Sequence, residues 1–326
     1  MKSESMNKRE YTAVILFILL SCGSFSQAGY DSTTISLGYP VYSQYLHNGL
    51  MINPAYAGSR EALSAVVSYR MQWMGTDGSP RLQSISLHSP MKDDKVALGL
   101  KAQFMQFGVT KSTSIYAVYA YHIRLKNSKL SFGLKAGADI SNTDYTGLLL
   151  VDNGDPVFTT SEKPYVLPNV GAGIYYFNKK YFAGLSVPSF LSYRKTDTGN
   201  TQAYHSFGQY DFIIFAGGLV NISQAFKFKP SVLIDYSFQR AKKLTQFDIN
   251  GNFIINDLIW AGISWRTTEQ VVVGLLQVEI TPQLMVGLSY DYPAGRMSSY
   301  SVIGSSEFIL RYEFGSKVSA ANPRYF

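Results

Sequence analysis

The sequence predicts an all-β fold, a transmembrane antiparallel β-barrel. Apolar side chains recur at every second position in segments between residues 62 and 314, and the turns between these segments alternate between short and long. From Leu130 to Ile140 one face is apolar, whereas the other carries Lys135 and Asp139. A period of two is that of a strand, and a strand with one apolar and one polar face suits a wall between lipid and a polar lumen.

Residues 1–28 are predicted to be a secretory signal peptide. Basic residues precede an apolar run from Ala13 to Leu20, and small residues follow it. The run is shorter than the roughly 20 residues that a membrane-spanning helix needs, so we expect no helical span. The single cysteine, Cys22, follows the run and excludes a disulfide. Ordinary cleavage and lipidation at Cys22 both remain open.

Residues 29–61 are predicted to be a leader or plug segment on the periplasmic side of the barrel. The run from Asn53 to Gly58 contains Asn-Pro and Ala-Gly, which mark turns. Two interpretations remain open. The leader plugs the barrel or folds under its mouth, or it docks a partner in the periplasm.

Residues 62–314 are predicted to form the barrel, with about 14 strands, an even number of the kind that bacterial barrels have. The strands are expected to begin near Ala62, Leu82, Lys95, Ser112, Lys129, Pro168, Tyr181, Gly208, Phe228, Leu244, Asp257, Gln270, Gln283 and Ser306.

The connections between these strands predict the orientation. The second, fourth, sixth, tenth and twelfth connections are tight and the eighth is nearly as short, whereas the fifth, seventh and thirteenth are the longest. Bacterial barrels have short periplasmic turns and longer outward loops. We therefore expect both termini in the periplasm and a protein of the cell outer membrane, surrounded by outer-membrane lipid.

Residues 315–326 are predicted to be a short periplasmic tail. The alternating pattern of the last strand closes at Phe314, and Pro323 cannot continue a strand ladder. The terminal residues Arg324, Tyr325 and Phe326 are therefore free to engage a periplasmic partner.

Composition argues against several functions. The formal charge of +7 is spread over turns and strand interiors, which indicates solvated turns and a cationic lumen and not nucleic-acid binding. The 24 tyrosines suit the aromatic girdles of a membrane barrel. The four histidines lack metal-ligand spacing and the context of a nucleophile and base. We therefore expect no catalytic residues, no bound metal and no cofactor.

Several segments, taken together, resemble a known family. They are Asn53 to Gly58, Tyr69 to Gly75 with its continuation to Gln83, Gly184 to Phe190, Asp291 to Tyr312, and Pro323 to Phe326. In this order they resemble the PorP/SprF family of outer-membrane proteins, which belong to the type IX secretion and gliding-motility apparatus of Bacteroidota. One departure is Ser306, where the family commonly has His.

The resemblance implies a barrel that helps to export, or holds at the cell surface, a partner protein that bears a type IX sorting domain, often a large adhesin. For some members it also implies contact with periplasmic ring components of the apparatus. The competing function is a passive or substrate-specific outer-membrane channel. Its polar lumen would be lined by Lys101, Gln103, His122, Arg124, Lys135, Asp139, Asp235 and Gln239.

Candidate partner-binding residues lie in the first and last outward loops, which meet where strands one and fourteen pair. Arg70, Gln72 and Trp73 belong to the first loop, and Asp291 and Tyr292 to the last. Guanidinium groups and large rigid rings often anchor interfaces. The alternative is that Trp73 is a girdle residue and that Arg70 pairs with Glu307 or Glu313 inside the barrel.

Overall fold

The computed structural model describes residues 34–35, 41–91, 94–145, 164–195, 201–205, 207, 210–237, 243–295 and 303–315. All of them belong to one compact unit within residues 32–326. The signal peptide, Cys22 and the tail from residue 316 onward lie outside the described residues.

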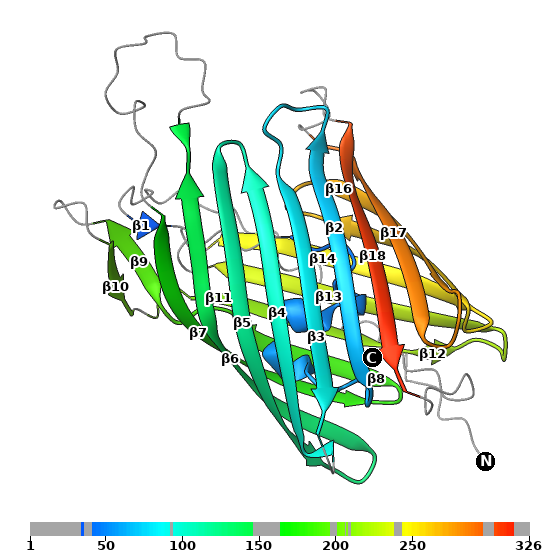
Figure 1. Ribbon diagram of the computed structural model, residues 1–326. Coiled ribbons are helices and arrows are strands. Elements are labelled where there is room, and N and C mark those ends of the chain that lie inside the picture. Colours follow the sequence, from blue (N-terminus) through cyan, green and yellow to red (C-terminus); the bar gives the residue numbers. More distant parts are fainter. Residues whose placement is uncertain are drawn as a thin grey trace. The chain divides into compact units, whose positions relative to one another are not determined.

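Fourteen antiparallel strands close into a barrel, which confirms the predicted fold (Figure 1). The ring closes because the last strand pairs with the first and β11 also pairs with β13. The wall strands are β2 (Leu63–Met74), β3 (Arg81–Pro90), β4 (Val96–Phe107), β5 (Thr110–Arg124), β6 (Ser128–Thr143), β7 (Tyr165–Asn178), β8 (Tyr181–Val187), β11 (Asp211–Gly218), β13 (Phe226–Ser237), β14 (Lys243–Ile255), β15 (Ile259–Arg266), β16 (Val271–Glu279), β17 (Leu284–Pro293) and β18 (Gly304–Phe314).

One wall strand is interrupted. β12 (Val220–Asn221) pairs with β13 in the same register as β11 does, so β11 and β12 are two parts of one strand. Between them the backbone N–H of Leu219 donates to the carbonyl of Lys180 at 2.7 Å, which continues the register of the β8–β11 pairing. The interruption therefore leaves the number of wall strands at fourteen.

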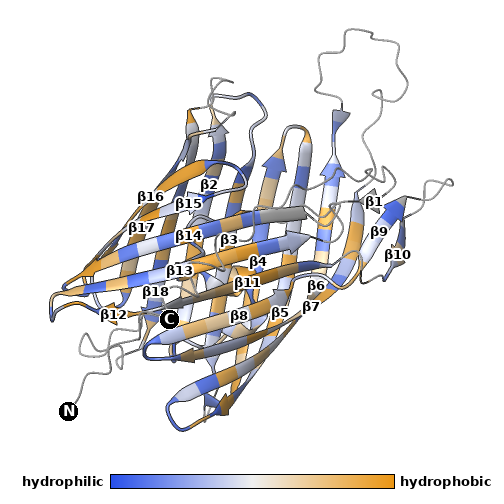
Figure 2. Ribbon diagram, turned by 180° about the vertical axis from the view of Figure 1, so that it is seen from behind, coloured by the Kyte–Doolittle hydropathy of each residue, from blue (hydrophilic) through white to orange (hydrophobic). Residues whose placement is uncertain are grey.

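The predicted alternation holds along the wall. On β6, Phe132 and Leu134 point outward and are 42% and 60% exposed, whereas Lys135 and Asp139 point inward and are buried. Figure 2 shows hydrophobic and hydrophilic residues alternating along the strands. The outer surface can therefore face lipid, and the closed ladder leaves no strand edge unpaired in it.

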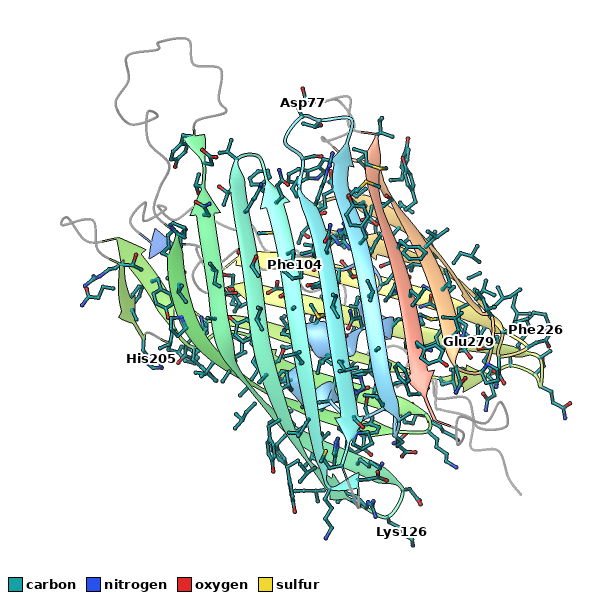
Figure 3. All side chains as sticks on the ribbon, viewed as in Figure 1. Asp77, Phe104, Lys126, His205, Phe226 and Glu279 are labelled. Carbon is teal, nitrogen blue, oxygen red and sulfur yellow. The ribbon has the colours of Figure 1, made fainter. Side chains whose placement is uncertain are left out.

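The two ends of the barrel differ. The even-numbered connections, 91–95, 125–127, 179–180, 222–225, 256–258 and 280–283, lie at what we call the short-turn end. The strand ends that the odd-numbered connections join, among them the connections 144–164, 188–210 and 294–303, form the opposite end, which we call the long-loop end. Figure 3 shows Asp77 and Lys126 at opposite ends. Among the described residues, no helix is both long enough and apolar enough to span a membrane.

The seventh connection contains structure that the sequence did not predict. β9 (Ser192–Lys195) and β10 (Thr201–Tyr204) form a hairpin there, and β1 (Thr34–Ile35) pairs with β9. The three form a small sheet separate from the wall. The first described residues of the chain therefore lie at the long-loop end, opposite the short-turn end where the leader was expected.

The interior of the barrel holds residues 41–62, which we call the lumen segment. It contains three short helices, η1 (Tyr45–His47), α2 (Gly49–Ile52) and η2 (Pro54–Tyr56), visible within the ring of strands in Figure 1. Every residue from 41 to 60 is buried except Val41 and Leu46, which are partly buried. The core of the protein is therefore the packing of this segment against the inner face of the wall.

Candidate functional site

The lumen segment gets its irregular path from local sequence signals. Asn48 and Asn53 interrupt the short helices, and Pro54 occupies the first position of η2. The side chain of Asn53 accepts a hydrogen bond from the N–H of Ala55 at 2.8 Å, which is the capping expected of Asn at a helix start. These breaks let the segment turn repeatedly and present side chains to all sides of the lumen.

A buried group of charges fixes the segment near the long-loop end. We call it the Ser43 cluster, and its members, each at most 4% exposed, are Ser43, Arg70, Asp248, Arg266, Asp291 and Glu307. The Ser43 hydroxyl donates to Asp291 at 2.8 Å, and the Ser43 backbone N–H donates to Glu307 at 2.9 Å. The hydroxyl also accepts a hydrogen bond from Arg70 at 2.9 Å. Through its hydroxyl and its backbone N–H, Ser43 thus joins three charged groups of the wall.

The charges of the Ser43 cluster are paired. Arg70 lies 2.6 Å from Asp291 and 3.4 Å from Glu307. Arg266 lies 3.1 Å from Asp248 and 3.2 Å from Asp291. Removing a charge from water is costly unless it is paired and hydrogen-bonded. Each carboxylate of the cluster has an Arg partner, so the cluster can remain ionised inside the barrel.

A second group fixes the segment near the short-turn end. We call it the Arg60 cluster, and it contains Arg60, Glu279, Arg311 and Glu313. Two guanidinium nitrogens of Arg60 lie 2.6 Å from Glu313 Oε1, and Arg311 bridges Glu313 at 3.4 Å and Glu279 at 3.3 Å. The lumen segment is therefore held by the hydrogen bonds of Ser43 to charged wall residues at one end and by the ion pair of Arg60 with Glu313 at the other.

His47 lies beside the Arg60 cluster. Its Nδ1 is 3.5 Å from Arg311 Nη1. Its ring also lies edge-on to that of Trp260, with ring centroids 5.0 Å apart. His47 is therefore packed between the Arg60 cluster and an aromatic ring of the wall.

Between the two clusters, wall side chains bind the backbone of the lumen segment. Lys101 Nζ donates to the carbonyl of Met51 at 2.9 Å, and Ser186 Oγ donates to the carbonyl of Ile52 at 2.6 Å. The last carbonyls of a helix have no partner within it, so a buried helix end needs such donors. Polar residues on the inner face of the wall supply them here.

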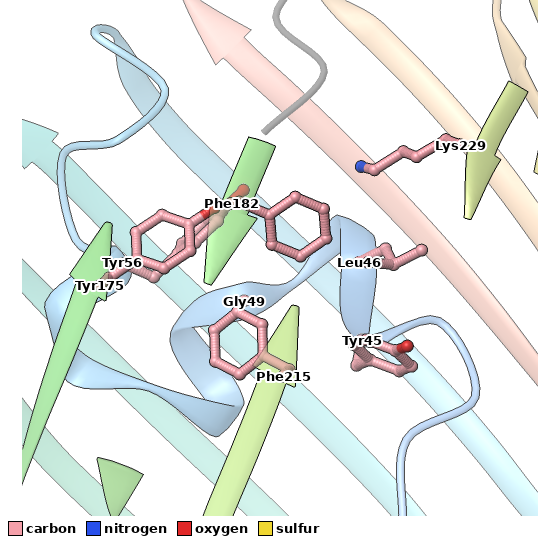
Figure 4. A pocket seen from close by; sticks show the side chains of 8 residues that line it. All are labelled: Tyr45, Leu46, Gly49, Tyr56, Tyr175, Phe182, Phe215 and Lys229. Atoms are coloured by element: carbon pink, nitrogen blue, oxygen red, sulfur yellow. The ribbon is translucent and has the colours of Figure 1, made fainter. Parts of the chain in front are cut away.

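Aromatic packing fills one side of the lumen. Tyr56 of the segment lies with its ring centroid 5.6 Å from that of Tyr175, and Tyr175 stacks on Phe215 at 5.7 Å. A cavity of about 10 Å³ remains between the segment and the wall (Figure 4). It has room for about one water molecule. Its lining residues are Tyr45, Leu46, Gly49, Tyr56, Tyr175, Phe182, Phe215 and Lys229.

Comparison with known proteins adds the family. A family model described as type IX secretion system membrane protein PorP/SprF matches residues 35–312. The chain belongs to the PorP/SprF family. The family and the barrel together identify an outer-membrane component of the type IX secretion system.

No curated protein matches this PorP/SprF protein significantly. Among solved structures it is similar to the CymD monoaromatic hydrocarbon channel, with 12% identity, 89% of this chain and 99% of that chain covered, and a TM-score of 0.48. It is also similar to the Ralstonia pickettii toluene transporter TbuX, with 9% identity, coverage of 87% and 96%, and a TM-score of 0.48. The NanC porin matches with 11% identity, coverage of 78% and 100%, and a TM-score of 0.39.

Two of the residues that the sequence suggested for partner binding lie inside the PorP/SprF barrel. Arg70 and Asp291 are 1% and 3% exposed and pair with each other in the Ser43 cluster. A partner outside the barrel cannot touch them in this conformation. The contact of Arg70 with Glu307 agrees with the alternative interpretation, in which Arg70 pairs inside the barrel.

Three other candidates lie at the long-loop end. Gln72 and Trp73 are partly buried on β2, and Tyr292 is 58% exposed on β17, on the other side of β18. Trp73 has a φ of 50°, in the left-handed region, and its N–H donates to Ser305 Oγ at 3.1 Å. The β2–β18 register shifts at this point. The remaining candidates, Arg324, Tyr325 and Phe326, lie outside the described residues.

Two of the residues proposed to line a channel, Lys101 and Gln103, bind the lumen segment through hydrogen bonds to Met51 and Tyr42. Lys101, Gln103, His122, Lys135, Asp139 and Asp235 are buried, Arg124 is exposed at the short-turn end, and Gln239 lies outside the described residues. Within the described part of the chain, no group of three or more His, Cys, Asp or Glu residues could hold a metal ion.

Sequence reasoning did not single out Ser43, Arg60 and Arg266 as members of the site. The sequence could have predicted a buried ion pair at Arg266, because this residue stands on the inward face of an alternating strand, where an unpaired charge would be costly. Ser43 and Arg60 had none, because the lumen segment has no period that assigns its side chains to a face.

Proposed function

We propose that this protein assists the export or surface anchoring of an adhesin-like protein with a type IX sorting domain, and that it does so as a scaffold with a closed lumen. The observation that carries the proposal is the burial of residues 41–60 between the Ser43 and Arg60 clusters. A secreted chain could pass only if this segment left, which would break the Arg60–Glu313 ion pair and the buried hydrogen bonds of Ser43 to Asp291 and Glu307.

The two ends of the barrel are then the proposed docking surfaces. The adhesin-like partner binds the long-loop end, which faces outward, and periplasmic ring components bind the short-turn end. The exposed ring of Tyr292 and the partly exposed ring of Trp73 support the first surface, because large aromatic side chains often anchor interfaces. The exposed apolar wall contacts outer-membrane lipid, and no catalytic step is proposed.

The test is recovery of partners from the native membrane. A tagged copy is solubilised from its outer membrane in mild detergent, and co-purifying chains are identified by mass spectrometry. We expect a large adhesin-like protein or periplasmic ring components with the wild type, and less of the adhesin-like protein with the variant Trp73→Ala/Tyr292→Ala. Tyr181→Ala, which removes a 61% exposed ring at the short-turn end, is the matched control. Reproducible recovery of the barrel alone would overturn the proposal.

Conductance tests the competing channel function. The purified wild-type barrel is inserted into a planar lipid bilayer and its current is recorded. The closed lumen predicts little or no steady conductance. A stable open current from the unmodified protein would support the channel function instead and would contradict the closed scaffold.

A further inference from the structure

The first and last wall strands, β2 and β18, pair along a seam that the lumen segment spans from inside. The pairing covers the length of both strands, with one irregularity near Gly304. The Ser43 cluster includes Arg70 of β2 and Glu307 of β18, and the Arg60 cluster includes Glu313 of β18. One cluster thus lies toward each end of the seam.

Three ion pairs at the seam join the beginning of the chain to its end. Arg60 and Arg70 come before or within the first strand, and their partners Asp291, Glu307 and Glu313 belong to the last two strands. The separations in sequence are 253 residues for Arg60 and Glu313, 221 for Arg70 and Asp291, and 237 for Arg70 and Glu307. All five side chains are buried, where opposite charges attract far more strongly than in water. The attraction therefore acts between the beginning and the end of the chain.

The lumen segment also binds β18 directly through neutral groups. The N–H of Ser43 donates to the Glu307 carboxylate at 2.9 Å, and the side-chain amide of Gln44 donates to the Glu307 carbonyl at 2.9 Å. We propose that the lumen segment is the template on which the barrel closes, because it binds the last two strands and brings β18 beside β2. This assembly function does not depend on the proposed secretion function.

The path of the segment supports this order of assembly. β1 lies at the long-loop end, and β2 begins at the short-turn end, so the segment runs the length of the lumen. A barrel that closed first would have to be threaded afterwards, and protein chains avoid threading. Closure around a segment that is already in place needs no threading. It also brings the Arg side chains and their carboxylate partners together while water is excluded from the lumen.

The experiment measures closure of the seam during refolding of the full chain into lipid vesicles. In a Cys22→Ser background, Val67→Cys and Leu310→Cys, which face each other across the seam, form a disulfide under mild oxidation when β2 and β18 pair. Leu100→Cys and Ala117→Cys, opposite each other on β4 and β5, report pairing away from the seam.

Three changes are compared in both reporter chains. Arg60→Gln should slow the seam disulfide by about tenfold and leave the β4–β5 disulfide unchanged, since loss of an interaction formed during closure slows folding. The exchange Arg60→Glu/Glu313→Arg should restore most of the rate. Arg124→Gln, which removes an exposed ion pair with Asp94 at the same end and outside the lumen segment, is the control and should change neither rate. Ser43→Ala, a milder change in the other cluster, should also slow only the seam.

The template function is wrong if Arg60→Gln and Ser43→Ala slow both disulfides equally, because the segment then supports the fold in general. It is also wrong if both variants leave the seam rate unchanged. Since refolding contains no secretion partner, neither result bears on the scaffold function, which partner recovery tests separately.

Discussion

At the scale of single residues, the buried charges of the lumen predict the largest effects on stability. Arg266 is fully buried and pairs with Asp248 and Asp291. Arg266→Met should lower the free energy of unfolding by about 3–5 kcal/mol, because both carboxylates lose a guanidinium partner. Urea unfolding in lipid vesicles, followed by the fluorescence of the three tryptophans, measures the loss.

The matched control for Arg266→Met is an exposed ion pair. Arg124 and Asp94 are 3.3 Å apart, with side chains 52% and 43% exposed. Arg124→Met should cost only about 0–1 kcal/mol, because water and salt screen such a pair. Equal losses for the two substitutions would contradict the importance that we assign to burial.

Trp73 gives a second prediction at this scale, on backbone strain. Its φ of 50° is a conformation that glycine adopts readily and alanine does not. Trp73→Gly should therefore be more stable than Trp73→Ala by about 1 kcal/mol, although both lose the same ring. The comparison uses the same unfolding measurement, and a more stable alanine variant would show that the left-handed backbone is not maintained.

At the scale of elements, the packing of the lumen segment predicts a way to open the barrel. Gly133 of β6 lies directly beneath the segment, and a Cβ placed there would overlap the backbone of Pro54 and Ala55. Gly133→Val should therefore displace the segment and raise ion conductance in planar bilayers. Gly274→Val is the control, since a Cβ at Gly274 meets nothing within 4 Å and should leave conductance unchanged. Equal conductance of both variants and the wild type would mean that the segment does not close the lumen.

At the scale of the whole molecule, the apolar outer face predicts that the loss of stability caused by an outward-facing Lys depends on its depth in the membrane. Leu134, 60% exposed in the middle of β6, faces the lipid, and Phe107 ends β4. Leu134→Lys should cost about 2–4 kcal/mol and Phe107→Lys about 0–1 kcal/mol, because a charge is tolerated near the membrane surface but not at its centre. Unfolding from vesicles measures both losses. The reverse order would contradict the placement of Leu134 near the membrane centre and Phe107 near its surface.

The wall could be predicted from the sequence because its signals are local. A period of two assigns each side chain to a face, and turn residues mark the ends, so every strand begins at most three residues from its expected start. The same reasoning puts Arg70 and Glu307 on the inward face, which is why their pairing could be considered in advance. Whether Arg70 binds a partner or pairs inside the barrel depends on contacts with residues 221 and 237 positions away in sequence.

The lumen segment and the hairpin of β9 and β10 could not be predicted for the opposite reason. Ser43 and Gln44 are held by Glu307, more than 260 residues later, and no local pattern encodes that distance. The strands β9 and β10 are four residues each, too short for alternation to distinguish them from a loop. The lumen segment thus depends on contacts distant in sequence, and the hairpin belongs to a small sheet separate from the wall.

The division of charge across the seam has a consequence for how such genes can recombine. A chimera that takes its leader and first strand from one family member and its last two strands from another inherits the two halves of three buried ion pairs from different parents. If the signs at positions 60, 70, 291, 307 and 313 do not match, buried charges are left unpaired, however similar the strands between them are. The beginning and the end of this chain are therefore expected to be exchanged together. The strands between them can be exchanged without breaking these ion pairs.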